Sequence, residues 1–244
     1  MQAIYKRELK AYFRTPLGYI FLSAFIFFAS LMFVLNNLNV QQTNLSGFFS
    51  NVSLIFVFVI PVLTMRLFSE ERKSKTDQLL LTAPVKVTDI VLGKFFAAAT
   101  ILLIGVAVTM LFIPIMELYG TPDIPESLVG YLGLFLMGLF FVALGMFMSS
   151  ITESQVIAAV STLAIIFFLW ALGGLNLQLS AFLTGSWAWL GKAVDWLLNF
   201  ISINNRMYEF TLGTLNFVPV FYFVSLAGLF VFLTVQVVER RRWK

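Results

Sequence analysis

The sequence predicts an all-α integral membrane protein whose single domain, residues 1–244, crosses the bilayer six times. Of its 244 residues, 60% are hydrophobic and 11% are charged, and the mean hydropathy is +0.93, whereas a water-soluble domain carries about 25% charged residues. A spanning helix needs about 20 apolar residues. Six segments meet this need once the short second run is extended into the charged sequence that follows it. The predicted spans are roughly 17–38, 53–70, 95–116, 128–150, 156–175 and 217–238.

Basic residues decide how these spans are oriented. All but Lys192 and Arg206 of the 16 Lys and Arg residues precede the first span, separate the second from the third, or follow the sixth. Because Lys and Arg near span ends stay in the cytoplasm, both termini are predicted to be cytoplasmic. The same topology explains the sequence pI of about 9.4, so no nucleic-acid partner is expected.

The first 14 residues predict an amphipathic helix that lies on the inner leaflet. At about 100° per residue, the apolar and aromatic side chains from Met1 to Phe13 fall within one arc and the bases fall on the adjacent arc, as in interfacial helices. Thr15-Pro16 then ends the helix and turns the chain into the bilayer. A basic flank that serves only to orient the first span is an equally good interpretation. The residues assigned to this helix are Tyr5, Lys6, Leu9, Lys10, Tyr12, Phe13 and Arg14.

Two features inside the spans concern how the helices pack. Pro61 removes one backbone hydrogen bond from the second span and should kink it, either as a hinge or as a feature of packing. In the fourth span, Gly145 and Ser149 form a pair of small residues four apart, which favours the close approach of another helix. The spacing leaves open whether that helix belongs to the same chain or to a dimer partner.

The segment 177–216, between the fifth and sixth spans, is rich in aromatic residues. Tryptophan side chains at headgroup level anchor a segment to the membrane interface, and Trp187, Trp189 and Trp196 are assigned this role. We expect one or two short amphipathic helices that pack on the outer ends of the spans or dip into the outer leaflet. Ordinary aromatic anchoring without a further role is the alternative.

The composition excludes several kinds of chemistry. The chain has no cysteine and no histidine, which excludes disulfides and thiolate metal sites and removes the commonest metal ligand and general base. No ionisable residue lies within the six apolar runs, so proton relays and intramembrane catalysis lack their usual side chains. The sequence GSWAWLGKA, residues 185–193, does not fit the phosphate-binding pattern G-x-x-x-x-G-K-[ST]. The chain is therefore not expected to be an enzyme or to bind ATP, a metal or a cofactor itself.

Charge is concentrated in residues 70–94, which hold four acids and five bases. Charged turns here alternate with Leu79, Leu80 and Leu81, and Pro84 imposes a stop. The pattern predicts a short cytoplasmic helix that is polar at its start and apolar at its end. Its leucines need to be covered by a partner surface, by the inner leaflet or by the chain's own spans.

The segment MRLFSEERKSKTDQLLLTAPVKVTDIVLGK, residues 65–94, resembles the corresponding segment of the type-2 ABC transporter permeases. Lys75 and Gln78 depart from the family pattern, where glycine and glutamate are usual. Two further segments, 149–170 and 222–243, resemble the branch that includes the gliding-motility permeases. The matching residues of the first segment are Glu70, Glu71, Arg72, Thr76, Leu79, Leu80, Pro84, Val85, Gly93 and Lys94.

The resemblance implies a fold and a set of partners. In that family six spans form one permease half, and a coupling helix between spans two and three, here residues of roughly 70–83, docks into a separate ABC ATPase subunit that binds ATP and Mg. A second permease copy or a paralogue completes the pair in a bacterial plasma (inner) membrane. The docking residues expected on this basis are Glu70, Glu71, Arg72, Thr76, Gln78, Leu79, Leu80 and Pro84.

On this basis the chain is expected to be the permease of an ATP-driven exporter, and the lack of charge in its spans favours an amphiphilic or hydrophobic substrate. Glu70, Glu71 and Arg72 are interpreted as part of a polar network between the coupling helix and the N-terminal helix, with a solvated helix end as the alternative.

A different class of function is also open. The chain would then be a non-transporting membrane anchor or assembly subunit of a gliding-type or cell-envelope complex, with an extracytoplasmic auxiliary membrane protein as partner.

Overall fold

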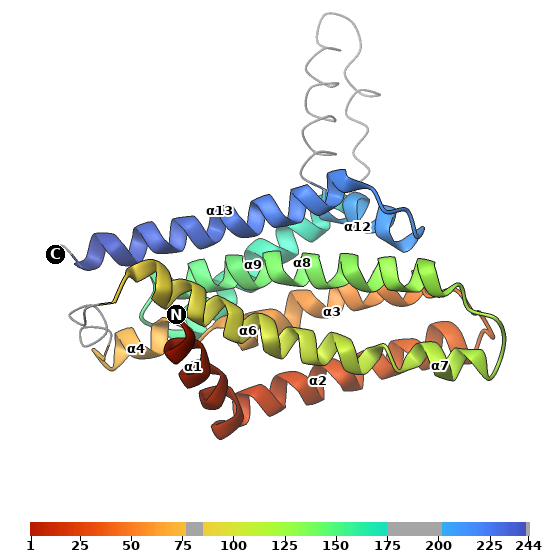
Figure 1. Cartoon of the computed structure of the whole chain (residues 1–244), viewed down its shortest axis with the longest axis horizontal. Helices are drawn as coiled ribbons and strands as arrows, with labels where there is room; N and C mark the ends of the chain where they lie inside the picture. Colours follow the sequence, from red (N-terminus) through yellow and green to blue (C-terminus); the bar gives the residue numbers. More distant parts are fainter. Residues whose placement is uncertain (77–84, 175–201, 243–244) are drawn as a thin grey trace, which may run out of the picture.

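The computed structural model describes residues 1–76, 85–174 and 202–242. Within these ranges the chain forms helices and no strand. Six helical stretches are long and apolar enough to cross a membrane, and they run side by side along the longest axis of the molecule (Figure 1). The predicted all-α, six-span fold class is confirmed.

Three of the six spans consist of a long helix followed by a short one. They are α2 (Pro16–Phe33) with the π-helical turn η1 (Val34–Leu38), α3 (Ser46–Thr64) with α4 (Ser69–Lys73), and α6 (Val87–Thr109) with α7 (Phe112–Glu117). The other spans are the single helices α8 (Ile124–Ile151), α9 (Gln155–Gly174) and α13 (Phe217–Arg242). Outside the spans, the described residues also form α1 (Gln2–Arg14) and α12 (Ile203–Thr211).

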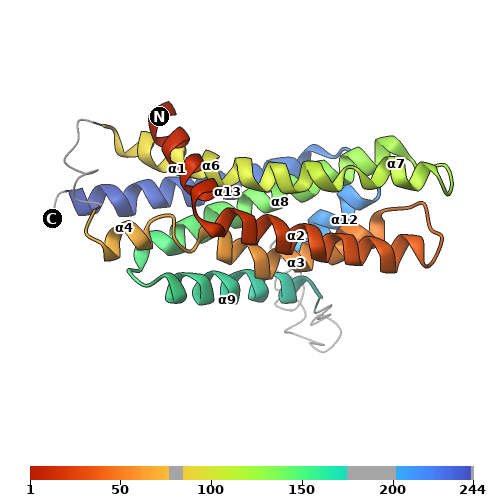
Figure 2. The same cartoon turned by 90° about the horizontal axis from the view of Figure 1, so that it is seen from below.

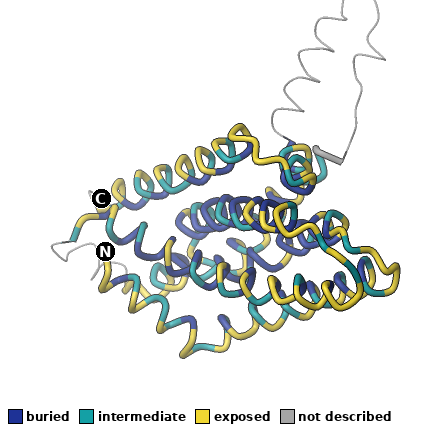
Figure 3. The backbone as a smooth tube through the Cα atoms, turned by 45° about the vertical axis from the view of Figure 1, so that its right-hand side comes forward, coloured by how far each residue is buried: buried dark blue, intermediate teal, exposed yellow. Residues whose placement is uncertain are grey.

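The spans built on α3, α6 and α8 occupy the middle of the bundle. The chain itself buries 61%, 50% and 72% of their most apolar stretches, and buried backbone fills the same region in Figure 3. The corresponding shares for the spans of α2, α9 and α13 are 28%, 17% and 28%, so these helices form the rim, with α9 at one edge (Figure 2). Their outward faces carry large apolar side chains such as Phe27, Phe168 and Phe221, which suit contact with lipid tails.

Close packing around α8 depends on glycines that face bulky neighbours. A Cβ atom at Gly145 would lie 2.2 Å from Thr64 Oγ1, and one at Gly133 would lie 2.4 Å from Phe210 Cγ. Larger residues at these positions would displace α3 or α12, because packed interiors leave no spare volume. The helix that approaches Gly145 closely is therefore α3 of the same chain.

The third span begins earlier than its apolar run. The sequence places its start near Phe95, whereas α6 begins at Val87. Lys94, which the sequence places in the loop between spans two and three, is thus the eighth residue of a spanning helix and is only 1% exposed. The two starts differ because hydropathy marks where an apolar run begins, while the helix itself continues through the charged residues before it.

The second span is interrupted shortly after its proline. Pro61 is buried within α3, which ends three residues later at Thr64. Residues 65–68 then form turns, and the chain resumes as α4 at Ser69. The interruption therefore lies about one helical turn beyond Pro61, near one end of the bundle.

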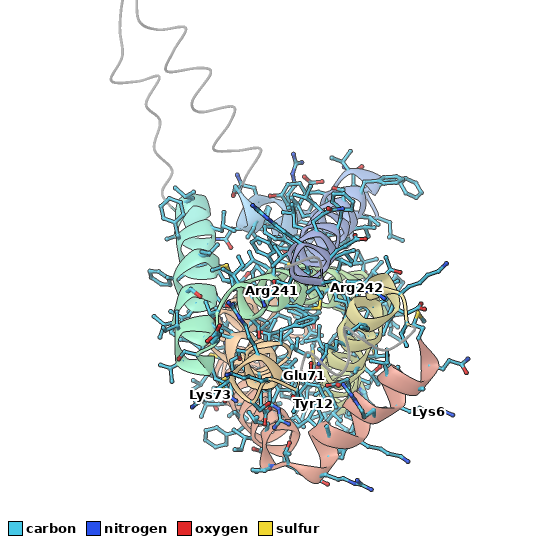
Figure 4. All side chains as sticks on the ribbon, turned by 90° about the vertical axis from the view of Figure 1, so that its left-hand side faces the viewer. Lys6, Tyr12, Glu71, Lys73, Arg241 and Arg242 are labelled. Carbon is cyan, nitrogen blue, oxygen red and sulfur yellow. The ribbon has the colours of Figure 1, made fainter. Side chains whose placement is uncertain are left out.

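The two ends of the bundle gather different elements. One end, called here the basic end, brings together α1, α4, the first turns of α6 and the last turn of α13 (Figures 1 and 4). The other end holds α7 and the connection from α7 to α8 (Figure 1). Glu117, Asp123 and Glu126 lie there, and the last turn of α13 contributes three arginines to the basic end.

A short helix, α12, forms within the aromatic segment between the fifth and sixth spans. Ile203, Met207 and Phe210 are buried, whereas Asn205 and Tyr208 are exposed. The helix packs against α8, α9 and α3, as expected for an amphipathic helix on the ends of the spans. The other predicted residues of this segment, Trp187, Trp189 and Trp196, lie outside the described residues.

Candidate functional site

A side chain from α8 satisfies the backbone groups that the break between α3 and α4 leaves open. Ser149 Oγ accepts hydrogen bonds from the backbone N–H groups of Phe68 and Ser69, at 3.1 and 3.2 Å. The same hydroxyl donates to the carbonyl oxygen of Met65 at 3.0 Å. Because unpaired backbone groups are costly in an apolar interior, this one hydroxyl stabilises both sides of the break at 65–68 and fixes α4 to α8.

The ammonium group of Lys94 lies at the centre of a charge cluster beside this break. Its Nζ atom lies 3.0 Å from Glu71 Oε2 and 3.4 Å from Glu8 Oε1. It also donates to the carbonyl oxygen of Leu67 at 2.7 Å and lies 5.1 Å from the centroid of the Phe68 ring. A buried ammonium is unfavourable unless it is paired, and here two carboxylates and a carbonyl supply the pairing. Lys94 of α6 is thereby joined to both α1 and α4.

Arg7 extends this cluster to the surface of α1. Its Nη2 atom lies 2.8 Å from Glu71 Oε1 and 2.7 Å from Glu8 Oε1. Burial lowers the pKa of Arg7, but the hydrogen bonds and charges of Glu8 and Glu71 together raise it by more, so that its pKa lies above the ordinary value. Each acid is therefore shared between Arg7 and Lys94. These four residues, Arg7, Glu8, Glu71 and Lys94, are called the charge cluster below.

Tyr12 fastens the end of α1 to α3. Its side chain is 3% exposed, and its hydroxyl donates to the carbonyl oxygen of Leu63 at 2.9 Å. Burial raises the pKa of Tyr12, the charge of Glu8 raises it further, and the charge of Arg66 opposes them. The hydroxyl is thus kept protonated as a donor, and α1 cannot lift from the bundle without exposing an unpaired carbonyl group.

Two further contacts hold α1 against the spans. Arg66, in the break, donates from Nη1 to Thr15 Oγ1 at 3.0 Å, while its Nε lies 2.9 Å from Glu70 Oε2. Nearer the start of α1, the hydroxyl oxygen of Tyr5 lies 3.1 Å from Thr100 Oγ1 of α6. Helix α1 is consequently linked to α3, α4 and α6 along its whole length.

On its other side α4 is tied to the connection between α8 and α9. Arg72 Nε lies 3.0 Å from Glu153 Oε1, and its Nη1 donates to the carbonyl oxygen of Ile151. Arg241 of α13 donates to the neighbouring carbonyl oxygen of Ser150. Carbonyl groups in the last turn of α8 thus accept hydrogen bonds from arginines of both α4 and α13.

The charge cluster lines an open pocket of about 310 Å³ between α1 and α4. Figure 4 shows Glu71 and Tyr12 where these two helices meet, whereas Lys6 and Lys73 point away from the bundle. Among the described residues, no group of His, Cys, Asp and Glu could hold a metal ion. What this site offers is ion pairing and hydrogen bonding, which can hold helices in a fixed relation and present a polar surface to a protein partner.

The residues predicted for the coupling helix fall into two sets. Glu70, Glu71 and Arg72 lie on α4, and each makes an ion pair. Glu70 pairs with Arg66 in the break before α4, Glu71 pairs with Arg7 of α1, and Arg72 pairs with Glu153 after α8. Thr76 is exposed in the turn that follows α4. The coupling helix itself stays a prediction, because four of its residues lie outside the described part of the chain: Gln78, Leu79, Leu80 and Pro84.

The residues predicted for the interfacial helix lie in different surroundings. Tyr12 is buried, and Tyr5 and Leu9 are partly buried against the chain's own core. The apolar side of α1 therefore covers α6 and α3 in addition to any lipid. Four of the predicted residues are exposed: Lys6, Lys10, Phe13 and Arg14.

Sequence reasoning did not identify the residues that hold this site together. Glu8, Arg66 and Ser149 were not assigned a role at the site, and Lys94 entered only as part of a family pattern. The Gly93-Lys94 pair carried a usable signal. A Cβ atom at Gly93 would lie 3.0 Å from Ile4 Cγ2, so the glycine lets α1 cross α6 closely enough for the adjacent lysine to reach Glu8.

Comparison with known families relates this architecture to transport. The family model described as "ABC-2 family transporter protein" matches residues 2–238, which is nearly the whole chain and includes α1 and the charge cluster. None of the curated proteins compared with the chain matches it. Members of this family are membrane components without ATPase activity of their own, and they work with an ABC ATPase subunit. The chain therefore belongs to the ABC-2 transporter family, as a multi-pass membrane component of a transporter.

Proposed function

We propose that this chain is the permease subunit of an ATP-driven exporter, in which the charge cluster passes movement of an ATPase partner on to the spans. The observation that supports this most is that α4 is fastened to α1, α6 and α8 by charged and polar side chains. The residues that follow α4, from Ser74 to Thr76, are exposed at the basic end. A force applied to that exposed segment would act directly on α1 and on the spans of α6 and α8.

The basic end is proposed to face the cytoplasm of a bacterial cell. Lys6, Lys10 and Arg14 of α1 are exposed there, and the three arginines at the end of α13 lie at the same end. Lys and Arg near span ends favour the cytoplasmic side. Residues 74–84 would then lie in the compartment that contains ATP.

In this mechanism a separate ABC ATPase subunit binds ATP with Mg and docks on residues of roughly 70–84. Leu79 and Leu80 would lie against an apolar surface of that subunit. When the partner moves, α4 is not expected to follow alone, because separating Lys94 from Glu71 would remove one of the two carboxylates that pair the buried ammonium. Helices α1 and α6 would move with α4, while Pro61 and the break at 65–68 allow this unit to turn against the rest of α3.

The proposed substrate is amphiphilic or hydrophobic. Among the described residues, Lys94 is the one charged side chain that is buried, and it is fully paired at the basic end. The remaining buried polar groups in the spans are hydroxyls and amides, including Thr109, Thr162 and Thr234. The hydroxyls of these three threonines donate to carbonyl oxygens of their own helices, so the described parts of the spans hold no unpaired buried charge that would favour an ion.

A second permease, either another copy or a paralogue, is proposed to complete the path. The rim helix α9 has only 17% of its apolar stretch buried by the chain itself, and Val156, Ile157 and Val160 on it are strongly exposed. A pair of six-span units would bury part of this surface and enclose a path between them.

Cysteine cross-linking tests the proposal, since the native chain has no cysteine. A photoreactive cross-linker attached to Lys73→Cys, which is exposed on α4, is expected to capture a nucleotide-hydrolysing subunit in native membranes. Tyr119→Cys, at the opposite end and 71% exposed, serves as the matched control and should not capture it. Capture from both positions, or from neither, would contradict the proposed docking.

A further inference from the structure

A shallow apolar groove lies on the outer surface of the bundle, between α6, α8 and α13. Its volume is about 250 Å³, and almost all of its lining is apolar. Neither the charge cluster nor the residues proposed for docking take part in it, so it needs a separate explanation. Its principal lining residues are Leu92 and Phe95 of α6, Leu139 of α8, and Val224, Gly228 and Val231 of α13.

Gly228 makes this groove deeper than helix packing requires. The residue is exposed, and a Cβ atom at this position would meet no atom within 4 Å. By contrast, a Cβ atom at Gly138 of α8 would lie 2.7 Å from Leu102 Cδ2. Gly228 therefore does not serve contact with a helix of this chain, and the space beside it is open to an apolar occupant from outside.

The face of α13 that lines the groove ends in an arginine at the basic end. At about 100° per residue, Arg242 lies within about 40° of both Gly228 and Val231 around the helix axis. Arg242 Nη1 donates to the carbonyl oxygen of Val85 at 3.5 Å. This contact places the end of α13 beside the start of α6, where Lys86 is exposed.

The local charge at this end of the groove is positive. Two acids lie nearby, Glu239 in α13 and Asp89 in α6, and Asp89 lies 4.0 Å from the N-terminal ammonium of Met1. The last turn of α13 carries three arginines, Arg240 to Arg242, whose positive charge exceeds the negative charge of Glu239. One of them, Arg241, donates to the carbonyl oxygen of Ser150. An anionic group near Arg242 and Lys86 would therefore be attracted.

The spacing between the bases and the groove matches one leaflet of a bilayer. With a rise of 1.5 Å per residue, Leu92 lies about 9 Å from Lys86 along α6, and Val231 and Gly228 lie about 16 and 21 Å from Arg242 along α13. Half of a bilayer, headgroups included, is about 20–22 Å thick. With the bases at the headgroups, the part of the groove from Leu92 to Gly228 lies at the depth of the acyl chains in the same leaflet, and Gly228 lies near their ends.

We infer that the groove binds an anionic phospholipid, with one acyl chain beside Gly228 and the phosphate near Arg242 and Lys86. A flexible chain fits this surface better than another helix. Phe221 and Phe232, which are 70% and 57% exposed, project from nearly the same side of α13, whereas close helix pairs need small residues at the contact.

Lipid retention by the full chain tests this inference. The protein would be reconstituted in vesicles of equal parts phosphatidylcholine and phosphatidylglycerol, re-extracted in mild detergent, and examined by native mass spectrometry. Wild type should retain phosphatidylglycerol in preference to phosphatidylcholine. The double variant Lys86→Gln, Arg242→Gln should lose this preference by about fivefold for each base removed, whereas Lys10→Gln, Lys73→Gln removes equal charge elsewhere at the same end and should keep it.

A second pair of variants tests the groove itself. Gly228→Leu places a side chain in the groove, where its Cβ atom meets no other atom within 4 Å, and it should lower retention of both lipids at an unchanged melting temperature. Leu229→Phe adds bulk to another exposed position of α13 and should leave retention as in wild type. Equal retention by Gly228→Leu and wild type would overturn the inference. So would disulfide formation between two copies of Gly228→Cys in native membranes, because it would show that a second chain occupies the groove.

Discussion

Lys94 and Glu71 form an ion pair of 3.0 Å between α6 and α4, at a point where the lysine side chain is only 1% exposed. The pair joins the second and third spans directly, next to the segment that connects them in sequence. Glu8 and Arg7 add α1 to the same unit.

Replacing Lys94 with methionine is expected to lower the free energy of unfolding by about 3 kcal/mol. Methionine keeps most of the side-chain volume but leaves Glu8 and Glu71 without their buried cation. Denaturation in detergent micelles, followed by circular dichroism, measures the loss.

A double-mutant cycle with Glu71→Gln isolates the pair itself. The double variant should recover part of the loss, with a coupling energy of about 1–3 kcal/mol. Strictly additive effects of Lys94→Met and Glu71→Gln would show that the two side chains do not interact in solution.

Ser149→Ala is expected to cost about 1–3 kcal/mol, because it leaves the backbone N–H groups of Phe68 and Ser69 without their partner at the break, whereas the carbonyl oxygen of Met65 keeps a hydrogen bond from Ser69 Oγ. Ser150→Ala is the matched control, since the Ser150 hydroxyl donates only to Phe147 of its own helix, and it should change stability little. The comparison is made by thermal unfolding of the two purified variants. Equal melting temperatures for both would contradict the assigned role of Ser149.

Gly145→Ala and Gly133→Ala should each destabilise the chain by about 1–3 kcal/mol, because the added methyl group meets Thr64 or Phe210 at a distance that requires a shift of the helices. Gly228→Ala has no such neighbour and should be neutral or stabilising by about 0.5 kcal/mol. Thermal unfolding of the three variants in one detergent would decide the order. A destabilised Gly228→Ala variant would argue against the open groove.

Stability at alkaline pH should depend on Tyr12. Burial raises its pKa in the folded state, so the folded state holds the phenol proton more tightly than the unfolded state does. The stabilisation is complete below the unfolded pKa of about 10 and is lost as the pH rises beyond it. Tyr12→Phe should be less stable than wild type at neutral pH and should show a weaker decline above pH 10. An identical decline in both proteins would contradict this assignment.

Much of the fold follows from the sequence because the hydrophobic effect acts on long segments. A run of apolar residues long enough to span the bilayer is a signal that neighbours in space cannot easily override. The same reasoning does not reveal that α6 begins before its apolar run, because Lys94 looks solvent-exposed in a hydropathy plot. Its burial is possible only with Glu8 and Glu71, which lie far away in the sequence.

The site was predictable only in part for a related reason. The expectation that Glu70, Glu71 and Arg72 belong to a polar network between the coupling helix and the N-terminal helix rested on the family resemblance, and all three make ion pairs in the structure, of which that of Glu71 reaches α1. The partners of Glu71 and Arg72 could not be deduced, since Arg7, Lys94 and Glu153 are brought to α4 by the packing of α1, α6 and the connection that follows α8. The close crossing of α1 over α6 at Gly93 could not be predicted from helical periodicity, because periodicity shows which face of a helix is apolar and does not show which helix packs against it.

The central claim, that residues 70–84 dock an ATPase, is tested most directly by co-purification. Wild-type chain and a Leu79→Asp, Leu80→Asp variant would be captured from solubilised membranes, and ATP hydrolysis in the eluates measured. A Leu118→Asp, Tyr119→Asp variant adds the same charge to exposed positions at the opposite end. We predict that wild type and the control retain an ATPase subunit and that the folded Leu79, Leu80 variant loses it. If wild type retains no ATPase, the permease mechanism is contradicted and a non-transporting membrane anchor becomes the better explanation.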